Sequence, residues 1–471
     1  MRIERWALAA TLLIYVGLHA PRLDAPALGR DSWREADGLM VAQNYCREGA
    51  PFLSPRVSQR GDTDGATGME LPLLNRWVAL VACALGDAEE LAAFELVGRV
   101  TVLVFSVLGI VALWALCCRV LSARHAAVAT PLYAFSPLVF YYGRSFQPDV
   151  PALSLALLGL WLVARRWLPA AAVAFALALL VKLPAVVFLL PAAVLLASER
   201  RRAAPWVTLV AAVAPAALWY HHARQLQASS GLTVFTLSRS PGQLLEELMQ
   251  PFFWKSIFVQ HLFDVYLAPP AAVAAVLALV LLRRRLSALA LSMAAATLAF
   301  FLIGGHPAAH HLYYGVMAAP ALAILAAEGV EATGKRATWL AGVLAVTSLA
   351  WTVKRTWHWV APPSAREPVL AARAEALKLD AAHRPPRAVL FSAVDPTLMC
   401  QLGLHGWIAP PDGAAAWFTS QGPRPPLAVV DRWRVKGAEA QAVNAALVAA
   451  GYVLAREDDR LQVFANQAQA R

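Results

Sequence analysis

Residues 31–37, Asp-Ser-Trp-Arg-Glu-Ala-Asp, place three carboxylic acids and an arginine within one short polar segment. A carboxylate at an apolar boundary has its pKa raised towards neutrality, so Glu35 or Asp37 could serve as a general base. The structural alternative is that Asp31 or Asp37 caps the helix predicted by the next residues. Glu70 precedes a second apolar segment and could likewise hydrogen-bond a sugar or cap a helix.

Another acid, Asp149, lies in a short polar turn, 144–151, between two apolar runs. Charged groups this close to hydrocarbon are costly and tend to be retained for function. An aspartate at this place can also cap the helix that follows, and the two roles are compatible. Arg144, at the start of the same turn, is a candidate ligand for an anion.

Lys182 interrupts the otherwise continuous apolar stretch LALLVKLPAVVFLLP. A helix running from Arg166 to Lys182 is about 24 Å long, which puts the ammonium near one margin of an apolar layer. A cation there needs an anion, and three explanations stay open. The anion is a protein carboxylate such as Asp149 or Glu70, or it is a lipid phosphate, or the side chain snorkels to water.

Three histidines and two tyrosines gather in residues 304–314, with His306, His310, His311 and Tyr313 as candidate ligands of a phosphate or a sugar. Adjacent histidines do not point into one site from a regular helix, and no acid is near in sequence, so a zinc site is disfavoured. The alternative role for the tyrosines is an aromatic belt at a membrane interface.

The composition places these residues in a membrane protein. The chain has 471 residues, 59% hydrophobic and only 15% charged, which excludes an ordinary cytosolic enzyme. Its 16 Trp and 18 Phe exclude intrinsic disorder. The net charge of +11 comes from short basic clusters between apolar runs, which indicates membrane topology rather than nucleic-acid binding.

Apolar runs long enough to cross a hydrocarbon core of about 30 Å predict eleven spans. They are 6–20, 96–118, 126–142, 149–164, 168–181, 183–198, 205–220, 265–282, 286–304, 312–329 and 337–353. Basic clusters fall at every second connection: Arg2 with Arg5, Arg119 with Arg124, Arg165-Arg166, Arg200-Arg201-Arg202, Arg283-Arg284-Arg285 and Lys335-Arg336.

Because short cytoplasmic loops collect Lys and Arg, the amino terminus is predicted to be cytoplasmic and the carboxyl terminus extracytoplasmic. The same register puts every candidate residue named above on the outer side, in or beside residues 21–95, 142–149, 182, 221–264 and 305–311.

Three local features are consistent with this topology. Residues 73–87 are predicted to form an amphipathic helix in the outer interface, because counting them as a span would break the alternation of basic loops. The first span is interpreted as a retained anchor rather than a signal peptide, since Pro21 follows Ala20 at the cleavage position. A disulfide between Cys46 and Cys83 can form if both residues face an oxidising compartment.

The composition changes after Lys354. Strands are predicted in HRPPRAVLFSAVDP, LAVVDRW and LQVFAN, and a helix in AEAQAVNAALVAAG that ends near Gly451. The predicted architecture is an α-helical polytopic membrane domain, residues 1–355, with interfacial helices in the first outer loop, 21–95. A small extracytoplasmic α/β domain, residues 361–471, follows it.

In combination, these motifs resemble the GT-C polytopic glycosyltransferases that use polyprenyl-phosphate sugars. The likeness is to the bacterial branch that includes protein O-mannosyltransferases and aminoarabinose transferases, and it covers roughly residues 1–350. It is carried by Trp33-Arg34-Glu35-Ala36-Asp37, Glu70-Leu71-Pro72, Phe146-Gln147-Pro148-Asp149, Lys182-Leu183-Pro184 and His311-Leu312-Tyr313-Tyr314.

This resemblance implies transfer of a sugar from an undecaprenyl-phosphate-like donor to an acceptor hydroxyl at the extracytoplasmic face, with inversion. It implies Asp37 as the base, with Glu35 second, and Asp149 in support. Substrate would be bound by Arg34, Glu70, Arg144, Lys182, His306, His310, His311 and Tyr313. We expect the first-loop acid, Asp149 and Lys182 to serve one ligand.

Partners implied are the lipid-linked donor, membrane lipid and a lipid, glycan or protein acceptor, without nucleic acid. No particular cofactor is implied, and participation of a divalent metal stays open. The expected location is the bacterial inner membrane. Two other functions remain: a transporter or flippase of lipid-linked sugars, disfavoured because the acids cluster in loops rather than at mid-membrane, and a membrane-anchored binding or assembly protein.

Overall fold

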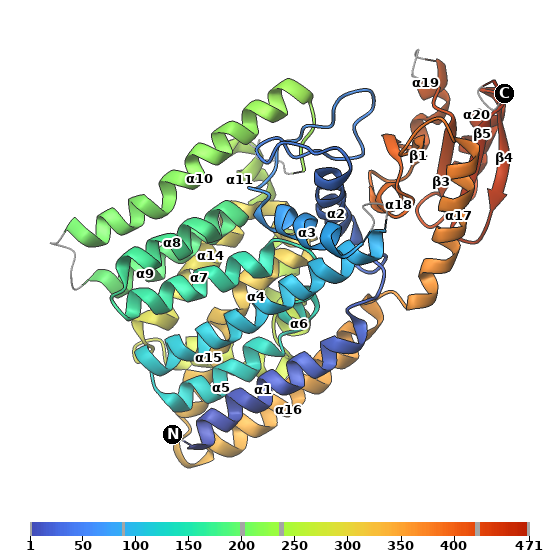
Figure 1. The fold of residues 1–471 in the computed structure, drawn as a ribbon. Helices are drawn as coiled ribbons and strands as arrows, with labels where there is room; N and C mark the ends of the chain where they lie inside the picture. Colours follow the sequence, from blue (N-terminus) through green and yellow to red (C-terminus); the bar gives the residue numbers. More distant parts are fainter. Residues whose placement is uncertain (1, 87–89, 198–202, 235–239, 420–423, 469–471) are drawn as a thin grey trace. The chain divides into compact units, whose positions relative to one another are not determined.

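The computed structural model describes residues 2–86, 90–197, 203–234, 240–419 and 424–468 (Figure 1). The contacts divide the chain into two compact units, which are described separately. The first comprises Met1–Leu23, Arg99–His222 and Thr236–Trp359, and the second Asp24–Gly98, Ala223–Phe235 and Val360–Arg471. The basic cluster Arg200-Arg201-Arg202, used above to orient the chain, lies outside the described residues.

The first unit is helical. Its elements in chain order are α1 (Arg2–His19), η1 (Ala20–Arg22), most of α4 (Leu91–Val120), α5 (Ala123–Ala134), α6 (Pro137–Tyr142), α7 (Asp149–Ala164), α8 (Leu168–Val181), η2 (Leu183–Phe188), α9 (Leu189–Leu196), most of α10 (Ala203–Ser230), α11 (Pro241–Met249), α12 (Pro251–Lys255), the π-helix η4 (Ser256–Tyr266), α13 (Pro269–Leu281), α14 (Ala288–His310), η5 (Leu312–Ala318), α15 (Ala319–Glu331), η6 (Gly334–Arg336), α16 (Ala337–Thr356) and η7 (Trp357–Trp359).

Among the described residues, five helical stretches are long and apolar enough to cross a membrane. They are Leu91–Val120, Ala203–Ser230, Ala288–His310, Leu312–Glu331 and Gly334–Leu379, and shorter apolar helices accompany them. Each of the eleven predicted spans coincides with a helix or with two consecutive helices. The predicted fold class, a polytopic helical membrane protein with a small C-terminal sheet, is confirmed.

Small residues let the apolar helices approach closely. Helices α7 and α8 lie side by side (Figure 1), and a Cβ atom added to Gly159 of α7 would come within 2.9 Å of the Phe175 ring of α8. Helix α15 packs against α13 in the same way, at Gly329 and Ala278. Lipid tails are as apolar as Leu, so this close packing, rather than the hydrophobic effect, holds such helices together.

Helix ends in this unit place the candidate residues. Helix α7 begins at Asp149, after Pro148, and α8 ends before Lys182, whose extended backbone (φ −158°, ψ 112°) precedes Pro184. Proline has no backbone N–H to donate, and its ring clashes with the preceding turn, so a helix rarely continues through a proline. Helix α8 therefore ends before Pro184. The predicted turns at 142–149 and at Lys182 are confirmed.

Two predicted boundaries are wrong. Helix α10 continues to Ser230, ten residues beyond the predicted end of its span at 220, and most of 221–264 is helical. Helix α14 continues to His310 through a break at Gly305 (φ 54°, ψ −142°), where the sequence predicts a turn from 304 onwards. A glycine and a proline in one apolar run mark a kink as readily as an end.

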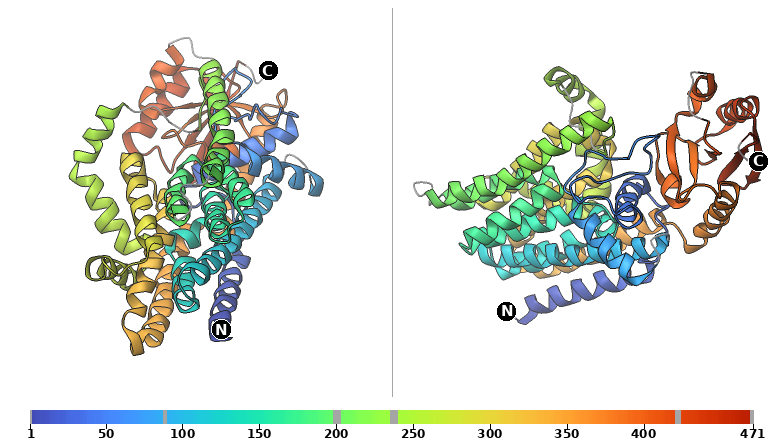
Figure 2. Two further views of the ribbon diagram at one scale, coloured as in Figure 1. Left: turned by 90° about the vertical axis from the view of Figure 1, so that its left-hand side faces the viewer. Right: turned by 45° about the horizontal axis from the view of Figure 1, so that its top comes forward.

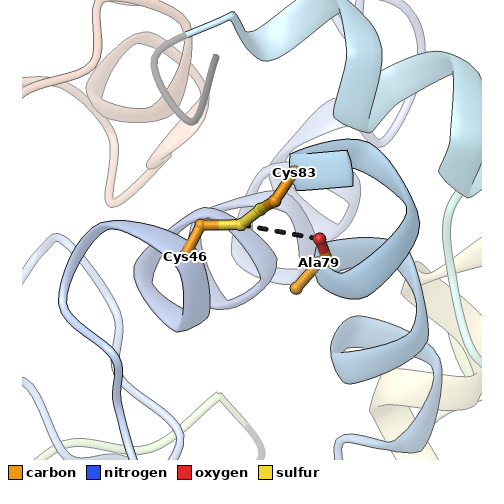
Figure 3. The surroundings of a disulfide bond; sticks show 3 residues. All are labelled: Cys46, Ala79 and Cys83. Carbon is orange, nitrogen blue, oxygen red and sulfur yellow. Dashed lines mark hydrogen bonds between the residues drawn. A yellow bond between two sulfur atoms is a disulfide. The ribbon is translucent and has the colours of Figure 1, made fainter. Parts of the chain in front are cut away.

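The first-loop part of the second unit contains α2 (Ser32–Arg47) and α3 (Leu73–Leu85). A disulfide between Cys46 and Cys83 joins them (Figure 3), with the two Cα atoms 6.5 Å apart. Helix α3 is amphipathic: Val78, Ala79 and Ala82 are buried, whereas Trp77 is 54% exposed. This is the pattern of the predicted interfacial helix.

The carboxyl-terminal part of the second unit is a five-stranded sheet in the order β2-β1-β3-β5-β4 (Figure 2, orange to red). Its elements are η8 (Pro363–Ala365), α17 (Arg366–Leu379), β1 (Arg387–Phe391), α18 (Thr397–Gln401), β2 (His405–Ala409), η9 (Pro411–Gly413), α19 (Ala414–Thr419), β3 (Leu427–Asp431), α20 (Gly437–Ala449), β4 (Tyr452–Glu457) and β5 (Leu461–Asn466). Strands β2, β1 and β3 are parallel, and β5 and β4 are antiparallel to their neighbours.

Alternate residues of β1 and β3, among them Phe391 and Val430, form one core with residues of α19 and α20 such as Phe418 and Leu447. The three predicted strands and the predicted helix of this domain are confirmed as β1, β3, β5 and α20. The sequence analysis missed β2 and β4. Strand β2 contains Gly406, which weakens a strand pattern, and the short apolar run that begins β4 is largely exposed rather than part of a buried strand.

Candidate functional site

Three of the predicted site residues meet in the second unit. Arg34 of α2 donates through Nη2 to both carboxylate oxygens of Glu70, at 2.7 and 2.8 Å. Its Nη1 lies 3.8 Å from Oδ2 of Asp37, one helical turn further along α2. All three side chains are buried, with 4–6% of each residue exposed. The arginine therefore lies between two carboxylates and favours Glu70.

Asp37 also accepts a hydrogen bond from the side-chain amide of Gln59, with Nε2 2.9 Å from Oδ1. Burial raises the pKa of Asp37 to about 6, against the opposing effects of Arg34 and Gln59. The negative charges of Glu70 and Asp395 raise it further. A carboxyl group with this pKa is ionised at neutral pH and can still take up a proton, which is what a general base needs.

The capping alternative is wrong for Asp37, which lies well inside α2. Asp31 is the residue before the helix, but its backbone is left-handed (φ 52°) and its side chain does not accept a capping hydrogen bond. Glu35 is buried on α2, two residues before Asp37. Residues i and i+2 of a helix do not face each other, so Glu35 is not on the side of the helix that carries Asp37.

A second group lies in the first unit. Nζ of Lys182 lies 3.5 Å from Oδ2 of Asp149, and both side chains are buried. The same ammonium lies 5.6 Å from the ring centroids of Tyr313 and Tyr314. His311 stacks on Tyr313, with the ring centroids 5.4 Å apart. Asp149 is thus the protein carboxylate beside Lys182, one of the three predicted explanations.

This arrangement brings together an ammonium, a carboxylate, two phenol rings and an imidazole. Asp149 occupies the first turn of α7, where the partial positive charge of the helix end favours an anion. The aromatic faces attract the ammonium, and the phenol hydroxyls and the imidazole can donate hydrogen bonds. Such a set of groups can hold a phosphate.

The remaining predicted residues also belong to the first unit. Arg144 is buried, with its guanidinium 5.7 Å from the Tyr141 ring centroid, and it donates to the carbonyl of Arg22 at 3.1 Å. His306 and His310 have ring centroids 5.1 Å apart. Both histidine rings contact Phe252, at 5.9 and 5.0 Å between centroids.

Two residues of these groups were not among the site residues predicted from the sequence. Gln59 lies in a polar loop with no recognisable motif, and only folding brings it under Asp37. Tyr314 adjoins the predicted Tyr313 and contacts Lys182 at the same distance. The pair of adjacent tyrosines in the sequence was the signal that could have identified Tyr314. Within the described ranges, no group of three or more His, Cys, Asp or Glu is placed to hold a metal ion.

Comparison with known proteins gives one family match. Residues 72–221 match the model of the dolichyl-phosphate-mannose-protein mannosyltransferase family. No sequence among the curated proteins matches the chain.

Solved structures share the fold of the whole chain. ArnT from Cupriavidus metallidurans bound to undecaprenyl phosphate is 15% identical with a TM-score of 0.61, covering 99% of this chain and 98% of its own. The oligosaccharyltransferase AglB from Archaeoglobus fulgidus, in complex with an inhibitory peptide and a dolichol-phosphate, is 13% identical with a TM-score of 0.59, covering 98% and 74%. The arabinofuranosyltransferase AftD from Mycobacteria is 14% identical with a TM-score of 0.60, covering 99% and 40%.

These matches confirm the predicted resemblance to GT-C glycosyltransferases. At identities of 13–15% the structural likeness establishes the fold. The resemblance extends beyond the predicted 1–350, because the matched structures cover nearly all of the chain, including its C-terminal sheet.

Proposed function

We propose that this chain is an integral membrane glycosyltransferase that moves a sugar from a polyprenyl-phosphate donor to an acceptor hydroxyl. The observation that carries the proposal is the buried Asp37, with a pKa of about 6, set between Arg34 and Gln59 in a chain of the GT-C fold. The family model that matches residues 72–221 supports the same chemistry.

The proposed reaction is a single displacement. The acceptor hydroxyl gives its proton to the Asp37 carboxylate while its oxygen attacks the anomeric carbon of the sugar. The bond from that carbon to the phosphate oxygen breaks, and the polyprenyl phosphate leaves with the electron pair. Attack opposite the leaving group inverts the anomeric carbon.

In this proposal the group around Lys182 binds the leaving phosphate. Phosphate is a good leaving group, so its developing charge needs stabilisation rather than an acid. Lys182 supplies a buried ammonium and Tyr313 a neighbouring hydroxyl, and Arg144 and one histidine of the His310-His311 pair are further candidates. Asp149 holds Lys182 in place until the donor arrives.

We further propose that the reaction takes place on the extracytoplasmic side of a bacterial inner membrane. The Cys46–Cys83 disulfide supports this side, since disulfides persist in oxidising compartments and are rare in the cytosol. The alternation of basic loops in the sequence favours the same orientation. The proposed domain limits remain 1–355 for the membrane domain and 361–471 for the C-terminal domain.

The test is sugar transfer by the full chain in liposomes, with undecaprenyl phosphate carrying a panel of hexoses and pentoses and with products identified by mass spectrometry. Asp37→Asn is expected to lower transfer about 10²–10⁴-fold, the usual loss of an essential base. Asp149→Asn is also expected to be impaired. Glu35→Gln is the matched control on α2 and should remain within a few-fold of the parent.

Full transfer activity in both aspartate variants would overturn the assignment of these residues. Movement of an intact lipid-linked sugar across the membrane, without its cleavage from the phosphate, would instead identify a flippase.

A further inference from the structure

The loop segment Ser58–Gly61 pairs with an edge strand of the C-terminal sheet. The backbone N–H of Gly406, in β2, donates to the carbonyl of Ser58 at 3.0 Å. The N–H of Gly61 donates back to the carbonyl of Gly406 at 2.7 Å. Strand β2 lies at the end of the sheet, and this exchange satisfies backbone groups on its open edge.

Two glycines lie at this contact, each where a side chain would not fit. Gly61 has a left-handed backbone (φ +58°), and a Cβ atom there would lie 2.8 Å from Nε1 of Trp407 in β2. Gly406 has φ +142°, and a Cβ atom there would clash with the carbonyl of Ala388 in the neighbouring strand. A side chain at Gly61 therefore presses the loop away from β2, and one at Gly406 presses β2 away from β1.

Charged side chains also stabilise the contact between the loop segment and β2. Arg60 lies between the two elements, with Nη2 2.7 Å from Nδ1 of His405 and Nη1 2.7 Å from Oε1 of Glu48. Burial, together with nearby Arg60 and Arg47, lowers the pKa of His405 to about 3. The imidazole is thus neutral at physiological pH and can accept a hydrogen bond from the arginine.

Gln59 lies between Ser58 and Gly61, which both hydrogen-bond to β2, and its side-chain amide points at Asp37. Ser58 is fixed by Gly406 on one side, Gly61 is fixed on the other, and the Gln59 amide donates to Oδ1 of Asp37 at 2.9 Å. The contact of α18 with α2 adds a second attachment of the C-terminal part to the helix that carries Asp37.

We propose that Gln59 is a positioning residue for the Asp37 carboxylate and that strand β2 of the C-terminal sheet holds Gln59 in place. The inference rests on the proposed function in one respect only, the identity of Asp37 as the base. It also gives the C-terminal sheet a role that no sequence motif indicates, which is to support the loop that carries Gln59.

The proposal predicts how Asp37 titrates. The other charged groups that act on this carboxylate are Arg34 on α2, Glu70 in the first loop and Asp395 in the C-terminal part. Removing the Gln59 donor takes away a hydrogen bond that favours the ionised form, so the pKa of Asp37 should rise by about one unit.

The experiment measures this pKa without requiring turnover. The Tm of the full chain in detergent is recorded against pH, with and without Asp37→Asn, and the difference curve reports the ionisation of Asp37. Gln59→Leu is expected to move the upper end of that curve to higher pH by about one unit and its midpoint by about half a unit, because the pKa in the unfolded state does not change. A midpoint unchanged by Gln59→Leu would overturn the positioning role of Gln59.

The role of β2 is tested from the loop side, which leaves the sheet sequence intact. Gly61→Ala should move the midpoint in the same direction as Gln59→Leu, and the two changes together should give no further shift. Gly49→Ala is the matched control: Gly49 has nearly the same left-handed backbone (φ +59°), but a Cβ atom there meets no atom within 4 Å.

Equal midpoints for Gly61→Ala and Gly49→Ala would overturn the role of β2. If Gly61→Ala does not fold, Arg60→Met tests the same contact by removing the link to His405, with the same shift expected and the same absence of shift counting against it. Failure of the proposed function is distinguishable, because it appears as a wild-type protein that titrates as described but transfers no sugar.

Discussion

Arg34 donates through one nitrogen to both carboxylate oxygens of Glu70, at 2.7 and 2.8 Å, while its other terminal nitrogen stays 3.8 Å from Asp37. Glu70 therefore competes with Asp37 for the same guanidinium. Burial, with the negative charge of Glu70 added to it, is why the pKa of Asp37 is raised although an arginine lies beside it.

Glu70→Gln should lower the pKa of Asp37. The substitution removes a negative charge that raises this pKa and leaves Arg34 available to Asp37. In the pH profile of sugar transfer, we expect the acid limb, where the rate falls as Asp37 is protonated, to move to lower pH by about one unit. Glu439→Gln, an exposed residue of α20, is the control. A shift of the limb to higher pH would contradict this account of the cluster.

Asp37→Asn should make the protein more stable than the wild type, but only above acidic pH. Asp37 has a pKa of about 6 in the folded chain, against 3.8 for an ordinary aspartate. As the pH rises from about 4 to about 6, the unfolded state ionises first, so the wild type loses up to about 3 kcal/mol relative to the variant.

Below about pH 4 the carboxyl group is protonated in both states and the two proteins should converge. Thermal unfolding across this range measures the effect. Parallel curves for the two proteins at every pH would show that Asp37 is not perturbed by folding.

Lys182→Met should weaken donor binding. Lys182 is the proposed ligand of the donor phosphate, and loss of its buried ammonium is expected to reduce affinity about 10–100-fold, measured as the increase in Tm on adding undecaprenyl phosphate. Lys354→Met is the matched control, because Lys354 also lies over an aromatic ring, 5.7 Å from Trp351, but is exposed.

The single change also removes the ammonium beside the buried Asp149, which by itself destabilises the fold. The Lys182→Met, Asp149→Asn double variant separates the two effects. It should regain stability without regaining the response to undecaprenyl phosphate. Wild-type affinity in this double variant would return Lys182 to a purely structural role.

Reduction of the Cys46–Cys83 disulfide should loosen the first loop. In the chain-entropy model, a bridge between cysteines 37 residues apart contributes about 2–4 kcal/mol to the stability of the segment it closes. Cys46→Ser with Cys83→Ser should therefore lower the Tm and increase proteolysis between α2 and α3. Cys118→Ser, the half-buried free cysteine of α4, is the control.

Thiol labelling of the protein from intact cells provides the check on location. Both cysteines should be protected until a reductant is added. Free, labelled thiols at Cys46 and Cys83 in the untreated protein would contradict the bridge and, with it, the support that it gives to an extracytoplasmic loop.

The sequence by itself determined the membrane architecture, because hydropathy and span length are local quantities set by the thickness of the hydrocarbon core. It also pointed to Lys182 and Asp149, since a charge inside or beside an apolar run is visible without a structure. The strands β1, β3 and β5 followed from local patterns of the same kind.

Only the tertiary structure decided which carboxylate takes Arg34, that Gln59 donates to Asp37, and that Gly406 pairs with the first loop. Each of these relationships joins segments separated by more than twenty residues, and one joins segments more than 300 residues apart. Hydrogen bonds and ion pairs at such separations depend on how helices and strands pack, and no local pattern of residue types encodes that packing.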